Sequence, residues 1–138
     1  MPGTTVKDVM TARPTSIESH APAVEAARRM ASENVGSLPV VEDGKLVGMV
    51  TDRDLVLNVT AKDLDPHKVS VGEVCSGDPI TTEPNESLDD ALQRMARDQV
   101  RRLPVVEDGQ LVGILAQADV ARTADPESTG RLVEEISE

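Results

Sequence analysis

The chain has 138 residues and a formal net charge of −11, with 38% hydrophobic residues and no Phe, Tyr or Trp. This length suits one compact domain, whose core must be built from aliphatic side chains and methionine. A negative field of this size repels nucleic acid and anionic membranes, so we expect neither as a partner. No secretory segment or long apolar run occurs, and we therefore expect a soluble protein of the cytoplasm.

An internal repeat organises the whole sequence. Residues 38–44, Leu-Pro-Val-Val-Glu-Asp-Gly, return 65 positions later as residues 103–109, and each copy continues into Leu-Val-Gly. Residues 6–54 and 71–119 keep this register without a gap. A period of this size indicates two copies of one supersecondary unit. Because each copy is too short to bury enough apolar surface alone, we expect the two to pack on each other with pseudo-two-fold symmetry.

The first copy is predicted to contain a short helix, a strand, a long helix, two strands and a final helix, in residues 6–10, 15–17, 23–31, 38–42, 46–50 and 52–59. The long helix is predicted from Ala and Met at helical spacing, with Pro22 at its first position. The two later strands are apolar runs joined at Asp43-Gly44, which is a strong hairpin signal.

The second copy repeats this pattern, with a short helix in residues 71–75, a strand in 80–82, a long helix in 88–96 and a hairpin at Asp108-Gly109. Asn85 is the predicted N-cap of its long helix. Each copy therefore reads strand, helix, strand, strand, helix, which predicts an α+β fold of two βαββα motifs. The predicted domains are motif 1 in residues 6–59, a linker in 60–70, motif 2 in 71–124 and a polar C-terminal tail in 125–138, with a frayed helix in 131–138.

No group of residues with the spacing of a catalytic site occurs. His20 and His67 have no spacing to Cys75 or to a pair of carboxylates that suggests a metal site or a triad, so we predict no enzyme, no metal and no cofactor. Cys75 stands where the first copy has Met10, which favours a small buried hydrophobe over a reactive thiol. Gly48 lets either a ligand or another stretch of backbone approach its strand closely.

The repeated residues resemble a tandem pair of CBS (cystathionine-β-synthase) motifs, the arrangement called a Bateman module. The resemblance covers residues 6 to about 124, and it depends on the L-P-V-V-x-x-G-x-L-V-G core in both copies and on Gly48-x-x-Thr51-x-x-Asp54. It implies the CBS-domain-pair fold, with two βαββα motifs packed about a pseudo-two-fold axis. The run Thr-Asp-Arg-Asp in residues 51–54 is similar to that of stand-alone bacterial CBS-pair proteins.

The family commonly binds adenosine-containing ligands in the clefts between its motifs and reports their levels to a partner, usually as a flat, disc-shaped dimer. The resemblance therefore implies a regulatory, energy-sensing homodimer that binds AMP, ADP, ATP or S-adenosylmethionine and signals to an unidentified effector protein. The alternative is a dimeric structural or interaction module that binds no ligand, since some members of the family have no known ligand.

A first nucleotide-binding site is implied by the resemblance, in which residues matching Thr51 and Asp54 contact phosphate and ribose. In several family members a basic pair at the positions of Arg101 and Arg102 reaches the phosphates. A hydroxyl and free N–H groups at the start of a helix suit a phosphate, and an arginine fork binds it bidentately. The implied site consists of Thr51, Asp54, Ile80, Thr81, Arg101 and Arg102.

These residues also have purely structural interpretations. Thr51-x-x-Asp54 is nearly a capping box, which would stabilise the helix with no ligand present. Arg101 and Arg102 suit solvated surface or a salt bridge within a dimer equally well. Both interpretations remain open at this point.

A second, weaker nucleotide-binding site is implied by the same pseudo-symmetry, consisting of Thr15, Ser16, Gly36, Ser37 and Asp119. It has no basic pair, so it suits a less charged adenosine ligand or stays empty. An acidic residue in the first turn of a helix is also favoured by the helix dipole alone, so Asp119 does not by itself indicate a ribose.

Overall fold

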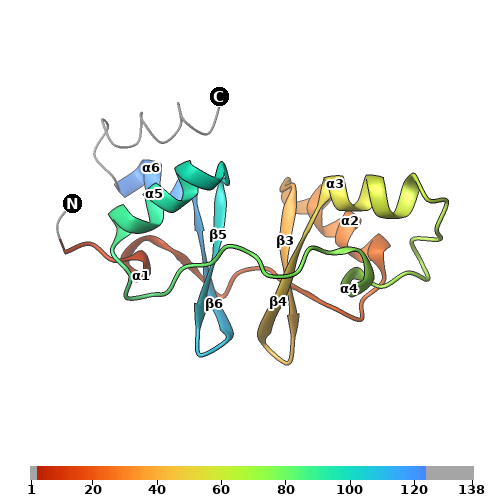
Figure 1. Ribbon diagram of the computed structural model, residues 1–138, viewed down its shortest axis with the longest axis horizontal. Helices are drawn as coiled ribbons and strands as arrows, with labels where there is room; N and C mark the ends of the chain where they lie inside the picture. The colour runs from red at the N-terminus through yellow and green to blue at the C-terminus, as the bar shows by residue number, and fades with distance from the viewer. Residues whose placement is uncertain (1–2, 124–138) are drawn as a thin grey trace. The chain divides into compact units, whose positions relative to one another are not determined.

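The computed structural model describes residues 3–123 of the chain, and these residues divide into two units. The contiguous unit is Thr15–Pro79, and the composite unit joins residues 3–14 to residues 80–123. Figure 1 shows that each unit is built on a β-hairpin with helices beside it. The helix expected in residues 131–138 lies outside the described residues.

The contiguous unit contains β2 (Ile17–Glu18), α2 (Ala23–Glu33), β3 (Ser37–Glu42), β4 (Lys45–Thr51), α3 (Asp52–Leu55), the π-helix η1 (Val56–Thr60) and α4 (Val71–Val74). Strand β2 pairs parallel to β3, which pairs antiparallel to β4. The predicted hairpin is confirmed, because Asp43 and Gly44 have φ of 51° and 82°, as a two-residue turn between twisted strands requires. One face of α2 packs on the hairpin in a core that includes Ile17, Ala26, Met30, Leu38, Val40 and Val50.

The composite unit contains α1 (Val6–Val9), β1 (Thr11–Ala12), α5 (Leu88–Asp98), β5 (Arg102–Glu107), β6 (Gln110–Ala116) and α6 (Gln117–Thr123). Strands β5 and β6 form an antiparallel hairpin, and β1 pairs antiparallel to β6. Its core includes Val6, Leu88, Met95, Leu103, Val105, Leu115 and Val120. Both units thus bury aliphatic side chains and methionine, as the composition predicts.

Each unit combines the body of one sequence copy with the segment that precedes the body of the other copy. We call these preceding segments, residues 3–14 and 69–79, the lead-ins. In the composite unit the N–H of Val6 donates to the carbonyl of Glu86 over 3.0 Å, and in the contiguous unit the N–H of Val71 donates to the carbonyl of Ala21 over 2.8 Å. These hydrogen bonds are equivalent under the repeat, so both lead-ins are held in the same way.

Gly48 allows the second lead-in to approach β4. The backbones of Met49 and Ser76 exchange two hydrogen bonds of 3.0 Å, and a β-carbon on Gly48 would stand only 2.6 Å from the carbonyl oxygen of Ser76. Gly113 has the same role in the other unit, where a β-carbon would stand 3.0 Å from the carbonyl oxygen of Thr11. Of the two roles left open for Gly48, the structure therefore shows close approach of another backbone.

Two predicted elements differ from the structure. The strand expected in residues 80–82 is wrong, since only an isolated bridge joins Thr82 to Val105, and Pro84 has no N–H with which to extend the pairing. The strand expected in residues 15–17 is displaced to β2, Ile17–Glu18. The helix expected in residues 52–59 exists, but after Leu55 it widens into the π-helix η1.

The two long helices begin at Ala23 and Leu88, as their predicted ranges do, but their N-caps differ from the prediction. Ser87 caps α5, because its hydroxyl accepts a hydrogen bond of 3.1 Å from the N–H of Asp90, so the assignment of Asn85 as the N-cap is wrong. Pro22 is the N-cap of α2 and precedes its first residue. In both helices the N–H of the first residue donates to a lead-in carbonyl, and this long-range bond attaches the helix start to the lead-in.

Candidate ligand-binding site

The predicted capping box at the start of α3 is fully formed. The hydroxyl oxygen of Thr51 accepts a hydrogen bond of 3.0 Å from the N–H of Asp54, and Oδ2 of Asp54 accepts one of 2.9 Å from the N–H of Thr51. Asp54 is half-buried. Among the described residues no hydrogen bond involves its Oδ1, so one carboxylate oxygen holds the helix start and the other is not used in the capping box.

Asp119, the equivalent of Asp54 in the second copy, has a different environment. Ala116 replaces the capping threonine, and Asp119 is instead buried, with 7% of its surface exposed. Its Oδ2 accepts a hydrogen bond of 3.1 Å from the hydroxyl of Thr11 in the first lead-in. The two carboxylates are therefore not interchangeable as ligand contacts.

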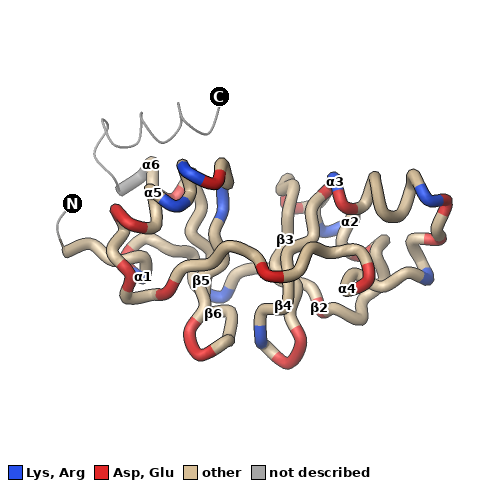
Figure 2. The backbone as a smooth tube through the Cα atoms, in the orientation of Figure 1, with Lys and Arg blue, Asp and Glu red and all other residues tan. Residues whose placement is uncertain are grey.

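The two copies also differ in charge just before their hairpins. The carbonyl of Arg101 accepts a hydrogen bond of 2.9 Å from the N–H of Gln117, and that of Gly36 accepts an equivalent bond from Asp52. A β-carbon on Gly36 would stand 3.2 Å from Oδ2 of Asp52, so a carboxylate lies beside Gly36 in the first copy. The second copy has Gln117 at the position of Asp52, and it carries exposed Arg101 and half-buried Arg102 at the positions of Gly36 and Ser37. The second copy carries two cations at these positions and the first copy none, and Figure 2 shows acidic residues at both hairpin turns, with a basic residue beside them at the β3–β4 turn.

The remaining predicted site residues have local partners. Thr15 donates a side-chain hydrogen bond of 2.8 Å to Glu33, and the carbonyls of Ser16 and Thr81 each accept a hydrogen bond from an arginine of the following helix. Ile80 is 39% exposed, which is unusual for a large aliphatic side chain in this protein.

Within each unit, the predicted site residues that lie close together come from the same sequence copy. Ser37 faces Thr51 across the β3–β4 hairpin, with Gly36 and Asp54 adjacent to this pair in sequence or in the capping box. Arg102 faces Ala116 at the equivalent register of β5 and β6. Each of the two predicted nucleotide-binding sites includes residues from both units. Whether these residues come together in one site therefore stays a prediction.

Cys75 is half-buried rather than fully buried, and it packs against the core of the contiguous unit. Burial raises the pKa of the Cys75 thiol, and the carboxylate of Asp54 raises that pKa further. A raised pKa keeps the thiol protonated and unreactive at neutral pH. The structural role expected for Cys75 fits this environment better than a reactive role does.

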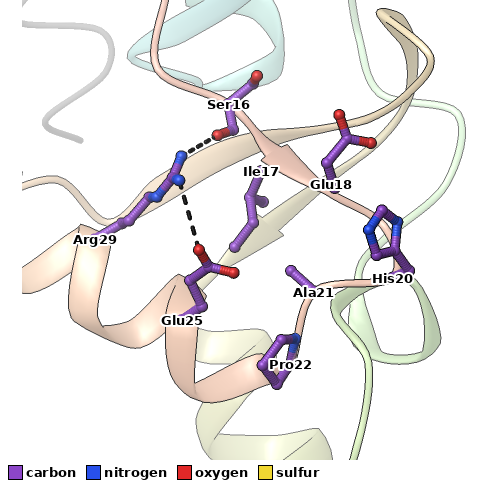
Figure 3. A pocket seen from close by; sticks show the side chains of 8 residues that line it. All are labelled: Ser16, Ile17, Glu18, His20, Ala21, Pro22, Glu25 and Arg29. Carbon is purple, nitrogen blue, oxygen red and sulfur yellow. Dashed lines mark hydrogen bonds and ion pairs between the residues drawn. The ribbon is translucent and has the colours of Figure 1, made fainter.

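A depression in the contiguous unit, with a volume of about 500 Å³, was not predicted from the sequence. Figure 3 shows Arg29 and Glu25 of α2 on one side of it and Glu18 and His20 on the other. Its lining consists of Ser16, Ile17, Glu18, His20, Ala21, Pro22, Glu25 and Arg29. Of these residues, only Ser16 was a predicted site residue.

Residues 3–123 contain neither a cluster of metal-binding side chains nor a helix that could span a membrane. Nowhere in this range do three or more His, Cys, Asp or Glu side chains gather in a way that could hold a metal ion. The same residues include no helix with the length and apolar character needed to cross a membrane.

Comparison with known proteins defines the class of the chain. The CBS domain model matches residues 6–61 and 71–125, and the chain therefore belongs to the CBS-domain family, as a pair of CBS domains. The resemblance and the α+β fold class predicted from the sequence are confirmed. The chain is 44% identical over 133 residues to the CBS domain-containing protein YhcV of Bacillus subtilis. The matched region covers 96% of this chain and 94% of the relative.

Solved structures of CBS-pair proteins are also similar. Hypoxic response protein I, solved with two coordinated zinc ions, has a TM-score of 0.78 and 38% identity, covering 87% of this chain and 98% of that one. CBSX2 in complex with AMP has a TM-score of 0.77 and 32% identity, covering 88% and 96%. The CBS pair of MJ0100, in complex with 5-methylthioadenosine and S-adenosylmethionine, has a TM-score of 0.71 and 30% identity, covering 86% and 98%.

Proposed function

We propose that this chain is a stand-alone CBS-pair regulatory protein that binds an adenosine-containing ligand and signals its level to a partner protein. The observation that carries the proposal is the similarity to CBSX2, which was solved with AMP. The complex of MJ0100 with 5-methylthioadenosine and S-adenosylmethionine supports the same ligand class. The proposed form is a cytoplasmic homodimer without enzymatic activity, and energy sensing follows if the ligand is AMP, ADP or ATP.

The proposed contacts divide between a carboxylate for the ribose and arginines for the phosphate. Asp54 supports the first role, because its Oδ1 is available while Oδ2 holds the capping box. Arg101 supports the second, because it is exposed next to Arg102 at the start of β5. In contrast, the buried Asp119 and the acidic Asp52 make the second predicted site a weaker candidate for an anionic ligand.

A melting experiment with a ligand panel tests this function. The panel is AMP, ADP, ATP with magnesium, S-adenosylmethionine and NAD, followed by a dye or by calorimetry because the chain has no Trp or Tyr. A ligand present at a hundred times its dissociation constant stabilises the folded state by about 2.7 kcal/mol, which moves the melting temperature measurably. The proposal expects a selective shift for one or two members of the panel.

Substitutions then locate the site. Asp54→Ala should abolish the ligand-induced shift, but it also breaks a capping box. Asp8→Ala is the matched control, because Asp8 forms the equivalent box with Thr5 at the start of α1 and is not a predicted contact. Arg101→Ala should weaken the binding of nucleotides more than the binding of adenosine. Arg28→Ala, on the exposed side of α2, should change neither affinity.

The rival function predicts a different outcome of the same panel. If no ligand shifts the melting temperature at millimolar concentration, a dimeric interaction module without a ligand becomes the better interpretation. Sedimentation equilibrium then measures the dimer directly. Hydrolysis of ATP by the wild-type protein would instead contradict the assignment as a non-enzyme.

A further inference from the structure

An arginine–glutamate pair beside α5 is present in the second sequence copy only. Nη1 of Arg94 donates hydrogen bonds of 2.9 Å to the carbonyl of Thr81 and to Oε1 of Glu86, and Nη2 pairs with Oε2 of Glu86. The hydroxyl of Thr82 donates to the same carboxylate over 2.5 Å. Glu86 is thus held by a bidentate fork, and Arg94 is the main cause that lowers its pKa to about 2.

The first copy keeps the arginine but lacks the carboxylate. Nη1 of Arg29 donates to the carbonyl of Ser16, as Arg94 does to Thr81. The position of Glu86 is taken by Ala21. The backbones of Ala21 and Glu86 have equivalent positions, since the carbonyl of Ala21 accepts a hydrogen bond from Val71 and that of Glu86 accepts one from Val6.

Among residues 3–123, Arg29 has a looser ion pair in place of the fork that Arg94 makes. Its nearest carboxylate is that of Glu25, one turn earlier on α2, and Nη2 of Arg29 lies 3.6 Å from Oε1 of Glu25. That separation is too long for a good hydrogen bond. The side chain of Arg29 is 41% exposed, compared with 27% for that of Arg94, so it is the more open to solvent of the two.

The depression described above lies where the missing side chain would stand. Ile17, Ala21 and Pro22 form its apolar part, and Figure 3 shows Ile17 and Ala21 between Arg29 and the opposite side that carries Glu18. Its volume of about 500 Å³ is ample for a carboxylate and a short aliphatic stem. The presence of an alanine where the other copy has a glutamate therefore accounts for both the space and the more exposed side chain of Arg29.

The acidic neighbours of the depression do not exclude a carboxylate. Glu18 and Glu25 correspond to Glu83 and Asp90 in the second copy, where a carboxylate nevertheless pairs with the arginine. The second copy thus shows that a fork of this kind accepts a carboxylate beside two further acids. The acidic neighbours therefore lower the affinity of the depression for a carboxylate but do not prevent the carboxylate from binding.

We propose that this depression is a binding site for the carboxylate group of a small organic acid, which takes the place that Glu86 occupies in the other copy. The Arg29 fork would bind the carboxylate, and Ile17, Ala21 and Pro22 would contact a short aliphatic stem. This site shares only Ser16 with the second predicted adenosine site, and it lies entirely within the contiguous unit.

Propionate is the suitable probe, because it corresponds to the glutamate side chain that Ala21 lacks. In the full-length protein, the NMR signals of the Arg29 Nε–H and of the Ala21 amide should shift on titration and saturate, with a dissociation constant on the order of 10 mM. Propionamide, which has the same shape and no charge, should cause no saturable shift. An equal response to propionamide would overturn the proposal.

Variants of the same chain provide the matched controls. Ala21→Glu should fill the depression from within and abolish the response to propionate, and Glu86→Ala should create a second response at Arg94. Arg29→Gln, at an exposed side chain, should fold and lose the response. A response that persists in Arg29→Gln would show that the carboxylate does not bind here.

The same titration distinguishes the two sources of a carboxylate. A blocked glutamate, N-acetyl-glutamate N-methylamide, presents the group as a protein side chain does. Binding of propionate that is at least as tight as that of the blocked glutamate supports a free acid as the ligand. Binding that is tighter by tenfold or more for the blocked glutamate would overturn the small-acid assignment in favour of a protein side chain.

Discussion

The hydroxyl of Thr11 donates a hydrogen bond of 3.1 Å to the carboxylate of Asp119, joining residues that are 108 positions apart. Through it the first lead-in is attached to the start of α6 as well as to β6. The equivalent carboxylate of the first copy, Asp54, is committed to its own helix start instead. Asp54 and Asp119, which occupy equivalent positions in the two copies, therefore have different structural roles.

Thr11→Val should destabilise the protein, because it removes a hydrogen bond to a buried carboxylate while preserving the β-branched shape. We expect the free energy of unfolding to fall by about 1–3 kcal/mol, as measured by chemical denaturation. Ser76→Ala, at the equivalent position of the second lead-in, is the control and should have a smaller effect. Equal losses for both variants would contradict a special role for the Thr11–Asp119 bond.

Gly48→Ala should be strongly destabilising, because the new β-carbon would meet the carbonyl oxygen of Ser76 at 2.6 Å. Separating the second lead-in from β4 to relieve this contact should cost about 1–3 kcal/mol. Gly77→Ala is the control, since a β-carbon on Gly77 would have nothing within 4 Å of it. The comparison is made by thermal and urea unfolding, and a neutral Gly48→Ala would disprove the close approach.

The Glu86–Arg94 pair should make stability depend on pH in the acid range. The folded-state pKa of Glu86 is lowered from 4.5 to about 2, so its contribution is fully present above pH 4.5 and is lost as the pH falls towards 2. The lowered pKa alone would correspond to about 3 kcal/mol, and screening by solvent near the surface makes the contribution smaller than that. Urea unfolding of wild type and Glu86→Gln from pH 6 to pH 2 should give curves that converge at the acid end. Parallel curves would contradict the lowered pKa.

Cys75 should react slowly with alkylating reagents, because burial and Asp54 raise the pKa of its thiol. Asp54→Asn should speed the reaction at pH 8, since it removes the negative charge while keeping an oxygen that can accept the hydrogen bond from Thr51. The rate of iodoacetamide labelling, followed by mass spectrometry, measures this effect. Asp43→Asn removes the same charge at the hairpin turn and should leave the rate unchanged.

Features that depend on neighbouring residues could be predicted from the sequence. The Asp43-Gly44 and Asp108-Gly109 turns and the Thr51–Asp54 capping box are all set by residues within a few positions of each other. The N-cap of α5 was misassigned because Asn85 and Ser87, two residues apart, are both good capping residues, and only the bond from Asp90 to Ser87 distinguishes them. The bond from Leu88 to the carbonyl of Thr4, which also holds the helix start, is not revealed by any local pattern. The exchange of lead-ins was missed for the same reason.

Prediction of the candidate sites was limited in a different way. The family resemblance assigned Asp54 and Asp119 the same role, but the burial of Asp119 depends on Thr11, far away in the sequence. The depression beside Arg29 depends on the absence of a side chain at Ala21. Only a comparison of this residue with Glu86 could have revealed it, and that comparison becomes meaningful once the Arg94 fork has been seen.

The exchanged lead-ins determine how the gene can be divided. A fragment cut at the repeat boundaries, such as residues 6–59, would keep Ala21 but lose Val71, whose N–H binds it. A fragment of Thr15–Pro79 keeps both, whereas the composite unit could be expressed alone only after circular permutation or fusion of its two parts. The boundaries of the repeated sequence and the boundaries of the compact structural units in this protein thus differ by the length of one lead-in.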